Sequence, residues 1–73
     1  MSNAIDGIHT TTNPKGTGWA NQAGGVILST HRDKPNAIAE ARQLAKKHGV
    51  LLTIHRRDGS VLRTQTYEPS PIV

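Results

Sequence analysis

The sequence predicts an α+β fold in which one helix packs on one face of an antiparallel sheet of about four or five short strands. Three observations support this fold. An amphipathic segment runs from Asp33 to His48-Gly49, two β-type runs flank Asp58-Gly59, and three short β-type runs precede the helix. The expected order of elements is therefore β-β-β-α-β-β.

The three runs before the helix are short and suited to strands. Residues 8–12 are rich in β-branched side chains, and residues 18–22 return after an Asn-Pro-Lys-Gly turn. Residues 26–31 resume a third strand after the break at Gly24-Gly25. Trp19 is the only large apolar side chain of the second strand. We expect it to cover one face of the sheet, and a binding role for its ring is the alternative.

The helix is expected to begin after Asp33, whose carboxylate can accept hydrogen bonds from free backbone N–H groups. Pro35 sits in the first turn, where a missing N–H costs little. Gly49 is the expected residue just past the end. The predicted apolar stripe recurs at helical spacing and consists of Ile38, Ala41, Leu44 or Ala45, and His48.

A hairpin is expected after the helix, between residues 50–55 and the strand that returns from Ser60 to Tyr67. Asp58-Gly59 is a favoured pair for a type I′ turn. A two-residue loop would place Arg63 opposite Ile54, and a longer loop would place Leu62 there instead. The sequence leaves these two registers open.

The composition describes one small basic domain. The chain has 73 residues, no cysteine, one Trp and one Tyr, and a formal net charge of +4. A core this thin rarely yields more than about 3–5 kcal/mol of net stability. Self-association would bury more apolar surface and so add to that stability. We assign residues 1–6 to a vector-derived, disordered start, residues 7–67 to a single domain, and residues 68–73 to a flexible proline-containing tail. With neither a secretory signal nor a membrane-length apolar run, we expect a cytoplasmic protein.

Short motifs follow one another along the chain in a fixed order. They are Gly18-Trp19-Ala20, Ser29-Thr30-His31, Ala37-Ile38, Ala41-Arg42, Leu44-Ala45, Ile54-His55, Asp58-Gly59 and Tyr67. This ordered set resembles the small bacterial domain family catalogued as domain of unknown function 2188. The resemblance spans about residues 8–67, and two departures are the helix start at Lys34-Pro35-Asn36 and the extension past Tyr67. Family members are short and have no established activity, so the resemblance implies the architecture rather than any chemistry.

The sequence offers little that points to catalysis or to a cofactor. His9, His31 and His55 lie on predicted strands and are weak candidates for a metal site, because no recognised ligand spacing is present. Ser29 and His31 share a strand face, and Asp58 is the only acid that could orient the pair. No catalytic residues are assigned, and we expect neither an enzyme nor a bound cofactor.

Two kinds of partner remain open. The leading expectation is a non-enzymatic interaction module that can form a homodimer through the uncovered face or an edge of its sheet. The alternative is a weak, sequence-nonspecific nucleic-acid binder that uses a basic face. Arg32 and Lys34, which precede the helix, add to the positive charge. The residues assigned to that basic face are Arg56, Arg57, Arg63, Lys46 and Lys47.

Overall fold

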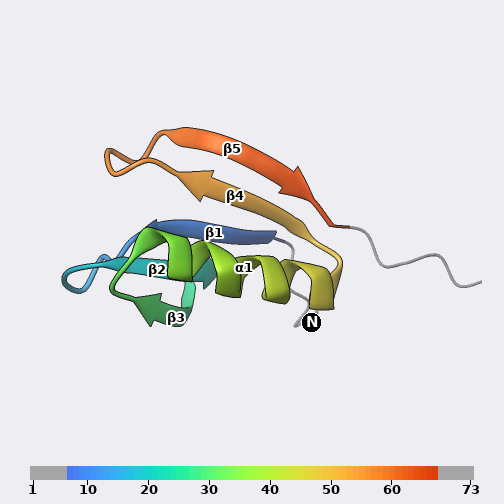
Figure 1. Ribbon diagram of the computed structural model, residues 1–73, viewed down its shortest axis with the longest axis horizontal. Helices are drawn as coiled ribbons and strands as arrows, with labels where there is room; N and C mark the ends of the chain where they lie inside the picture. Colours follow the sequence, from blue (N-terminus) through green and yellow to red (C-terminus); the bar gives the residue numbers. More distant parts are fainter. Residues whose placement is uncertain (1–6, 68–73) are drawn as a thin grey trace, which may run out of the picture.

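The computed structural model describes residues 7–67, and the predicted leader and tail lie outside these residues. The order of elements is the predicted β-β-β-α-β-β (Figure 1). The elements are β1 (Gly7–Thr12), β2 (Trp19–Ala23), β3 (Val26–His31), α1 (Lys34–His48), β4 (Leu51–His55) and β5 (Val61–Thr66).

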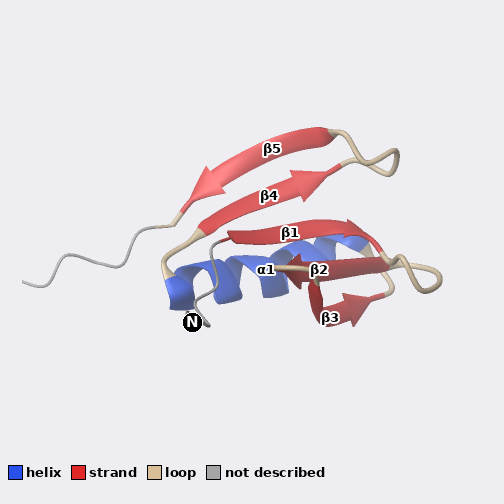
Figure 2. Ribbon diagram, turned by 180° about the vertical axis from the view of Figure 1, so that it is seen from behind, coloured by secondary structure: helices blue, strands red, loops and turns tan. Residues whose placement is uncertain are grey.

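The five strands form one sheet in the order β3-β2-β1-β4-β5, and α1 packs on one of its faces (Figures 1 and 2). The α+β prediction is confirmed, with one refinement: β1 and β4 pair in parallel, while the other three pairings are antiparallel. The parallel pair follows from the chain path. After β3 the chain crosses the sheet as a helix, so β4 runs in the same direction as β3. Because β1 also runs in that direction, β4 lies parallel to β1.

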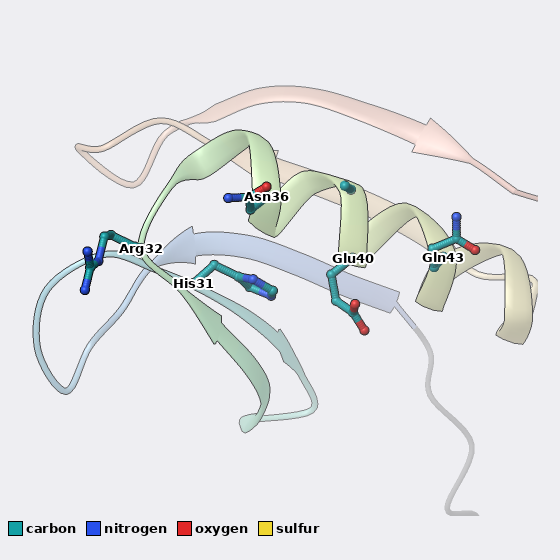
Figure 3. A pocket seen from close by; sticks show the side chains of 6 residues that line it. His31, Arg32, Asn36, Glu40 and Gln43 are labelled. Carbon is teal, nitrogen blue, oxygen red and sulfur yellow. The ribbon is translucent and has the colours of Figure 1, made fainter.

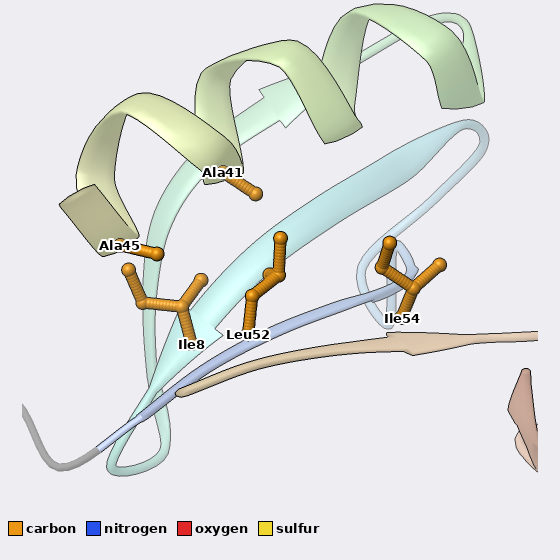
Figure 4. Packing of buried hydrophobic residues seen from close by; sticks show 5 residues of the cluster. All are labelled: Ile8, Ala41, Ala45, Leu52 and Ile54. Carbon is orange, nitrogen blue, oxygen red and sulfur yellow. The ribbon is translucent and has the colours of Figure 1, made fainter. Parts of the chain in front are cut away.

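The core lies between α1 and the neighbouring strands β1 and β4. Ile8, Leu52 and Ile54 project from β1 and β4 toward Ala41 and Ala45 of the helix (Figure 4). These five residues are buried, and the small alanine side chains let the helix sit close to the sheet. The sheet face opposite α1 carries no helix in the described chain, and we call it the open face.

The buried row of the helix follows a four-residue interval through Ala37, Ala41 and Ala45. Ile38 and Leu44 are half-buried beside this row, as the predicted stripe requires. The inclusion of His48 in that stripe was wrong, because its side chain is exposed. The buried row stops at Ala45, and the chain leaves the helix one residue after His48.

Both ends of α1 lie where the sequence predicted. Gly49 adopts φ 64° and ψ 41°, and Asp33 has the extended backbone of an N-cap residue. The carboxylate of Asp33, however, makes no hydrogen bond to the backbone. Pro35 occupies one of the two positions whose N–H an N-cap side chain normally engages, so that donor is missing. The carboxylate instead accepts a hydrogen bond from Asn36 Nδ2 at 3.4 Å.

The β4–β5 turn differs from the predicted type I′ turn. Such a turn needs positive φ at both central residues, yet no described residue other than glycine has positive φ. The N–H of Gly59 donates to Arg56 O at 2.9 Å, so the turn begins at Arg56, one residue earlier than expected. A bulge between Ile54 and His55 absorbs the extra length, and Arg63 therefore lies opposite Ile54.

Gly18 offers a test of how tightly the β1–β2 turn packs against the end of β3. Its φ is +87°, and an added Cβ would collide with the backbone carbonyl oxygen of His31. We expect Gly18→Ala to lower the free energy of unfolding by about 2–3 kcal/mol, through backbone strain and the displaced carbonyl. Gly16→Ala is the control, because a Cβ there meets nothing within 4 Å. Equal urea midpoints for the two variants would contradict this packing.

Candidate functional site

Three connections meet at one end of the sheet: the β1–β2 loop, the β3–α1 link and the β4–β5 loop (Figures 1 and 2). Together with Lys34, the first residue of α1, they hold five of the nine Lys and Arg residues of the chain. The parallel pairing of β1 and β4 brings the first and last of these loops to the same end. We call this group the cationic end, and its members are Lys15, Arg32, Lys34, Arg56 and Arg57.

Trp19 connects the helix and the last hairpin at the cationic end. Its side chain is only 6 % exposed, which confirms the expectation that it covers the sheet. Lys34 Nζ lies 4.7 Å from the centroid of the indole ring, and Arg57 Cζ lies 5.7 Å from it. Both distances are within the range of cation–π attraction. One ring therefore holds cations from two separate elements close together.

A hollow of about 630 Å³ opens beside this ring. Three cations line it, with the carboxylate of Asp33 as its one acidic group. The first turn of α1 forms part of the wall, where free backbone N–H groups add positive potential. The surface is therefore suited to an extended anion with several charged groups rather than to one small anion. The lining residues are Trp19, Arg32, Asp33, Lys34, Pro35, Asn36 and Arg57.

Arg56 and Asp58 stabilise the loop that presents Arg57. Arg56 Nη1 donates to Val61 O at 3.0 Å and to Ser60 Oγ at 3.2 Å, so its guanidinium braces the hairpin. The hydroxyl and the backbone N–H of Ser60 donate to Asp58 Oδ1 at 2.7 and 2.9 Å. These bonds lower the pKa of Asp58, because they favour the charged carboxylate.

The structure separates the basic residues that the sequence grouped together. Arg56 and Arg57 join Arg32 and Lys34 at the cationic end. Lys46 and Lys47 lie in the last turn of α1, and Lys46 is twelve residues from Lys34, which is about 18 Å along the helix. Arg63 lies on β5, the outermost strand beyond β4. Sequence reasoning missed Trp19 as the link, since the contacts of its ring depend on tertiary structure.

Two of the three candidate histidines come together. His9 on β1 and His55 on β4 face each other on the open face, with 2.9 Å between His9 Nδ1 and His55 Nε2. Partial burial, and then the charge on His55, lower the pKa of His9. His31 lies on β3 at the sheet edge, and its Nε2 is 3.1 Å from Ser29 Oγ. Within residues 7–67, no group of three or more His, Cys, Asp or Glu converges as a metal site would require.

A second hollow, of about 420 Å³, lies between α1 and the end of β3 (Figure 3). His31 and Glu40 point into this space. Ser29 and His31 are neighbours, as their spacing predicted. Asp58 is bonded to Ser60 in the β4–β5 loop, so these three residues do not form one site. The lining residues are His31, Arg32, Asn36, Ala39, Glu40 and Gln43.

Residues 8–67 match the model of a family described as an uncharacterised protein conserved in bacteria, DUF2188. The chain belongs to this family. No curated protein and no solved structure matches the chain. In the described part of the chain, no helix has the length and apolar character needed to cross a membrane. DUF2188 membership confirms the resemblance seen in the sequence motifs, and it supplies no activity.

The lowered pKa of Asp58 predicts a pH dependence of stability. The unfolded carboxyl titrates near 3.8, and the folded one titrates below that value. The unfolded chain therefore binds more protons in this window, and stability is lost as the pH falls from about 4 through the folded pKa. We expect Asp58→Asn to remove this part of the pH dependence in urea melts at pH 2.5–6. Ser60→Ala should remove part of it, and an unchanged profile in both variants would contradict the assignment.

Proposed function

We propose that this DUF2188 domain is a non-enzymatic interaction module that binds nucleic-acid duplexes without sequence preference through its cationic end. The observation that carries the proposal is the arrangement of Arg32, Lys34 and Arg57 around one hollow beside Trp19. The formal charge of +4 adds a long-range attraction for a polyanion. A cytoplasmic location, which we expect from the sequence, would give the domain access to such a partner.

Phosphate contacts suit this surface better than contacts with bases. Binders of single strands stack bases on exposed aromatic rings. Here Trp19 is nearly buried and two cations lie over its ring. Tyr67 is half-buried against the core. Neither ring offers an open platform, so we assign recognition to the duplex backbone, where Lys and Arg neutralise phosphates and release counterions.

The residues at the cationic end have different roles in this proposal. Arg32, Lys34 and Arg57 line the hollow and would contact phosphates directly. Arg56 holds the loop in place through Ser60 and Val61. Lys46, Lys47 and Arg63, which the sequence analysis grouped with them, would contribute only through the overall field, because they lie away from the hollow.

Salt dependence measures the number of phosphates contacted. We expect weak binding of a fluorescein-labelled duplex in fluorescence anisotropy, with log K falling against log salt at a slope of about −2.7 for three neutralised phosphates. A single strand of the same sequence should bind more weakly. A duplex of unrelated sequence should bind equally well. Absence of duplex binding at low salt would contradict the proposal.

Matched variants locate the contact. Arg57→Ala should reduce the salt slope by about 1, and Arg32→Ala should do the same. Lys47→Ala removes one positive charge at the far end of α1 and is the control, with an unchanged slope. Circular dichroism melts would confirm that each variant is folded. An equal loss of binding in Lys47→Ala and Arg57→Ala would indicate a general charge effect rather than this site.

A homodimer is the second candidate, and the open face is the surface that would form it. Leu51 and Val61 are 43 % and 51 % exposed. Leu51 lies on the side away from α1 because it alternates with the buried Leu52, and Val61 lies there because it pairs with His55 of the open face. Pairing through a sheet edge is disfavoured, since a register shift interrupts the pairing of each edge strand, β3 and β5, with its neighbour. Self-association there would bury apolar surface that one copy leaves in water.

Sedimentation equilibrium tests the dimer. We expect a concentration-dependent shift from monomer toward dimer, which Val61→Lys abolishes by placing a charge in the interface. Val26→Lys is the control, because Val26 is 60 % exposed on the outer strand β3. A monomer at every concentration, or equal disruption by both substitutions, would exclude the open face as a dimer interface.

A further inference from the structure

The histidine pair His9 and His55 lies on the open face, on the two strands that pair in parallel. Figure 2 shows this side of the sheet, with β1 and β4 next to each other. The two imidazole rings stack with their centroids 5.2 Å apart and their planes inclined by 29°. His9 Nδ1 and His55 Nε2 are 2.9 Å apart, so the two nitrogens face each other directly.

The hydrogen bonds of His55 determine which nitrogen carries its proton. His55 Nδ1 lies 3.0 Å from the carbonyl oxygen of Gly59. A carbonyl oxygen only accepts, so Nδ1 of His55 is the donor and holds the proton. In the neutral ring, Nε2 of His55 then has a free lone pair aimed at His9. The N–H at Nδ1 of His9 donates to this lone pair.

We propose that this pair is a binding site for a divalent transition-metal ion of the zinc class, with His9 Nδ1 and His55 Nε2 as its two protein ligands. The ion would replace the shared proton, and neutral His9 would carry its proton on Nε2 instead. Zinc binds imidazole nitrogen at about 2.0–2.1 Å, so tetrahedral coordination places two ligand nitrogens about 3.3 Å apart. The two rings need to separate by only a few tenths of an ångström.

The Gly59 carbonyl strengthens this assignment. Histidines that bind metals usually donate the other ring N–H to a carbonyl or carboxylate, which fixes the tautomer and the direction of the ring. His55 already has this arrangement, and the carbonyl belongs to the tight β4–β5 turn. Water would complete the coordination, because the described residues bring no third His, Cys, Asp or Glu to the pair.

Metal binding here would join the two halves of the fold. β1 belongs to the N-terminal strands and β4 to the C-terminal hairpin, and their pairing is the only strand contact between these halves in the described chain. An ion held by one residue from each strand binds the folded state and not the unfolded chain. Stability would therefore rise with the concentration of the ion. This inference does not depend on nucleic-acid binding, because the pair lies on β1 and β4 rather than in the hollow.

Zinc titration of the full, tag-free chain after treatment with a chelator tests the site. In long-range ¹H–¹⁵N spectra, we expect zinc to shift His9 Nδ1 and His55 Nε2, with His31 and His48 unaffected. This readout needs no variant. Shifts confined to His31 or His48, or an unchanged spectrum at millimolar zinc, would overturn the assignment.

Variants give a second readout by calorimetry and thermal melting. His9→Gln and His55→Gln should each lose at least about tenfold in zinc affinity. The rise in Tm that zinc produces should disappear in both. His48→Gln is the control, because that side chain is exposed at the end of α1. Retention of the parent affinity by either His9→Gln or His55→Gln would show that the two rings form a hydrogen bond only.

Discussion

The buried amide of Asn21 fixes the position of the helix on the sheet. Its side chain is completely buried, and Nδ2 donates to Ala37 O at 2.9 Å and to Ser29 Oγ at 3.2 Å. Thr10 Oγ1 donates to Asn21 Oδ1 at 2.7 Å. A buried polar group without partners would be costly, so these bonds favour one seating of α1 over others. Because Trp19 lies two residues away on the same face of β2, that seating also places Lys34 over the indole ring.

The row of small alanine side chains lets the same helix pack close to the sheet. Ala37, Ala41 and Ala45 fill little volume, so the few large side chains of β1 and β4 complete the core. A core of this size leaves little reserve of stability. Polar and cation–π contacts at the periphery therefore contribute a larger share of the folding stability than they would in a larger domain. The crossover from β3 to β4 then brings three loops to one end, where their positive charges concentrate.

Local patterns were sufficient to predict the elements, while contacts between distant residues were not predictable. The strands, the helix and its end at Gly49 follow from periodicity and from residues that favour helix ends. The prediction of a type I′ turn was wrong because the turn begins at Arg56, and the bulge between Ile54 and His55 absorbs the extra length of the loop. The parallel pairing of β1 with β4 depends on the path of the helix, which no short motif specifies.

The candidate sites also divide into features that local sequence predicts and features that depend on contacts between distant residues. Arg56 and Arg57 could be proposed from sequence because they are adjacent in the chain. Their separation from Lys46, and their link to Lys34 through Trp19, depend on the folded position of α1. The meeting of His9 with His55, rather than with His31, depends on strand order, since β2 separates β3 from β1. The closeness of these two side chains became visible only in three dimensions.

We propose that Asn21, by fixing the position of the helix, brings together the residues around Trp19 that bind phosphate. Titration of ¹⁵N-labelled protein with a short duplex at low salt distinguishes this site from the rest of the surface. We expect the Trp19 indole N–H and the amides of Lys34 and Arg57 to shift together, with one affinity. Shifts confined to the open face, or to the end of α1 near Lys47, would contradict it.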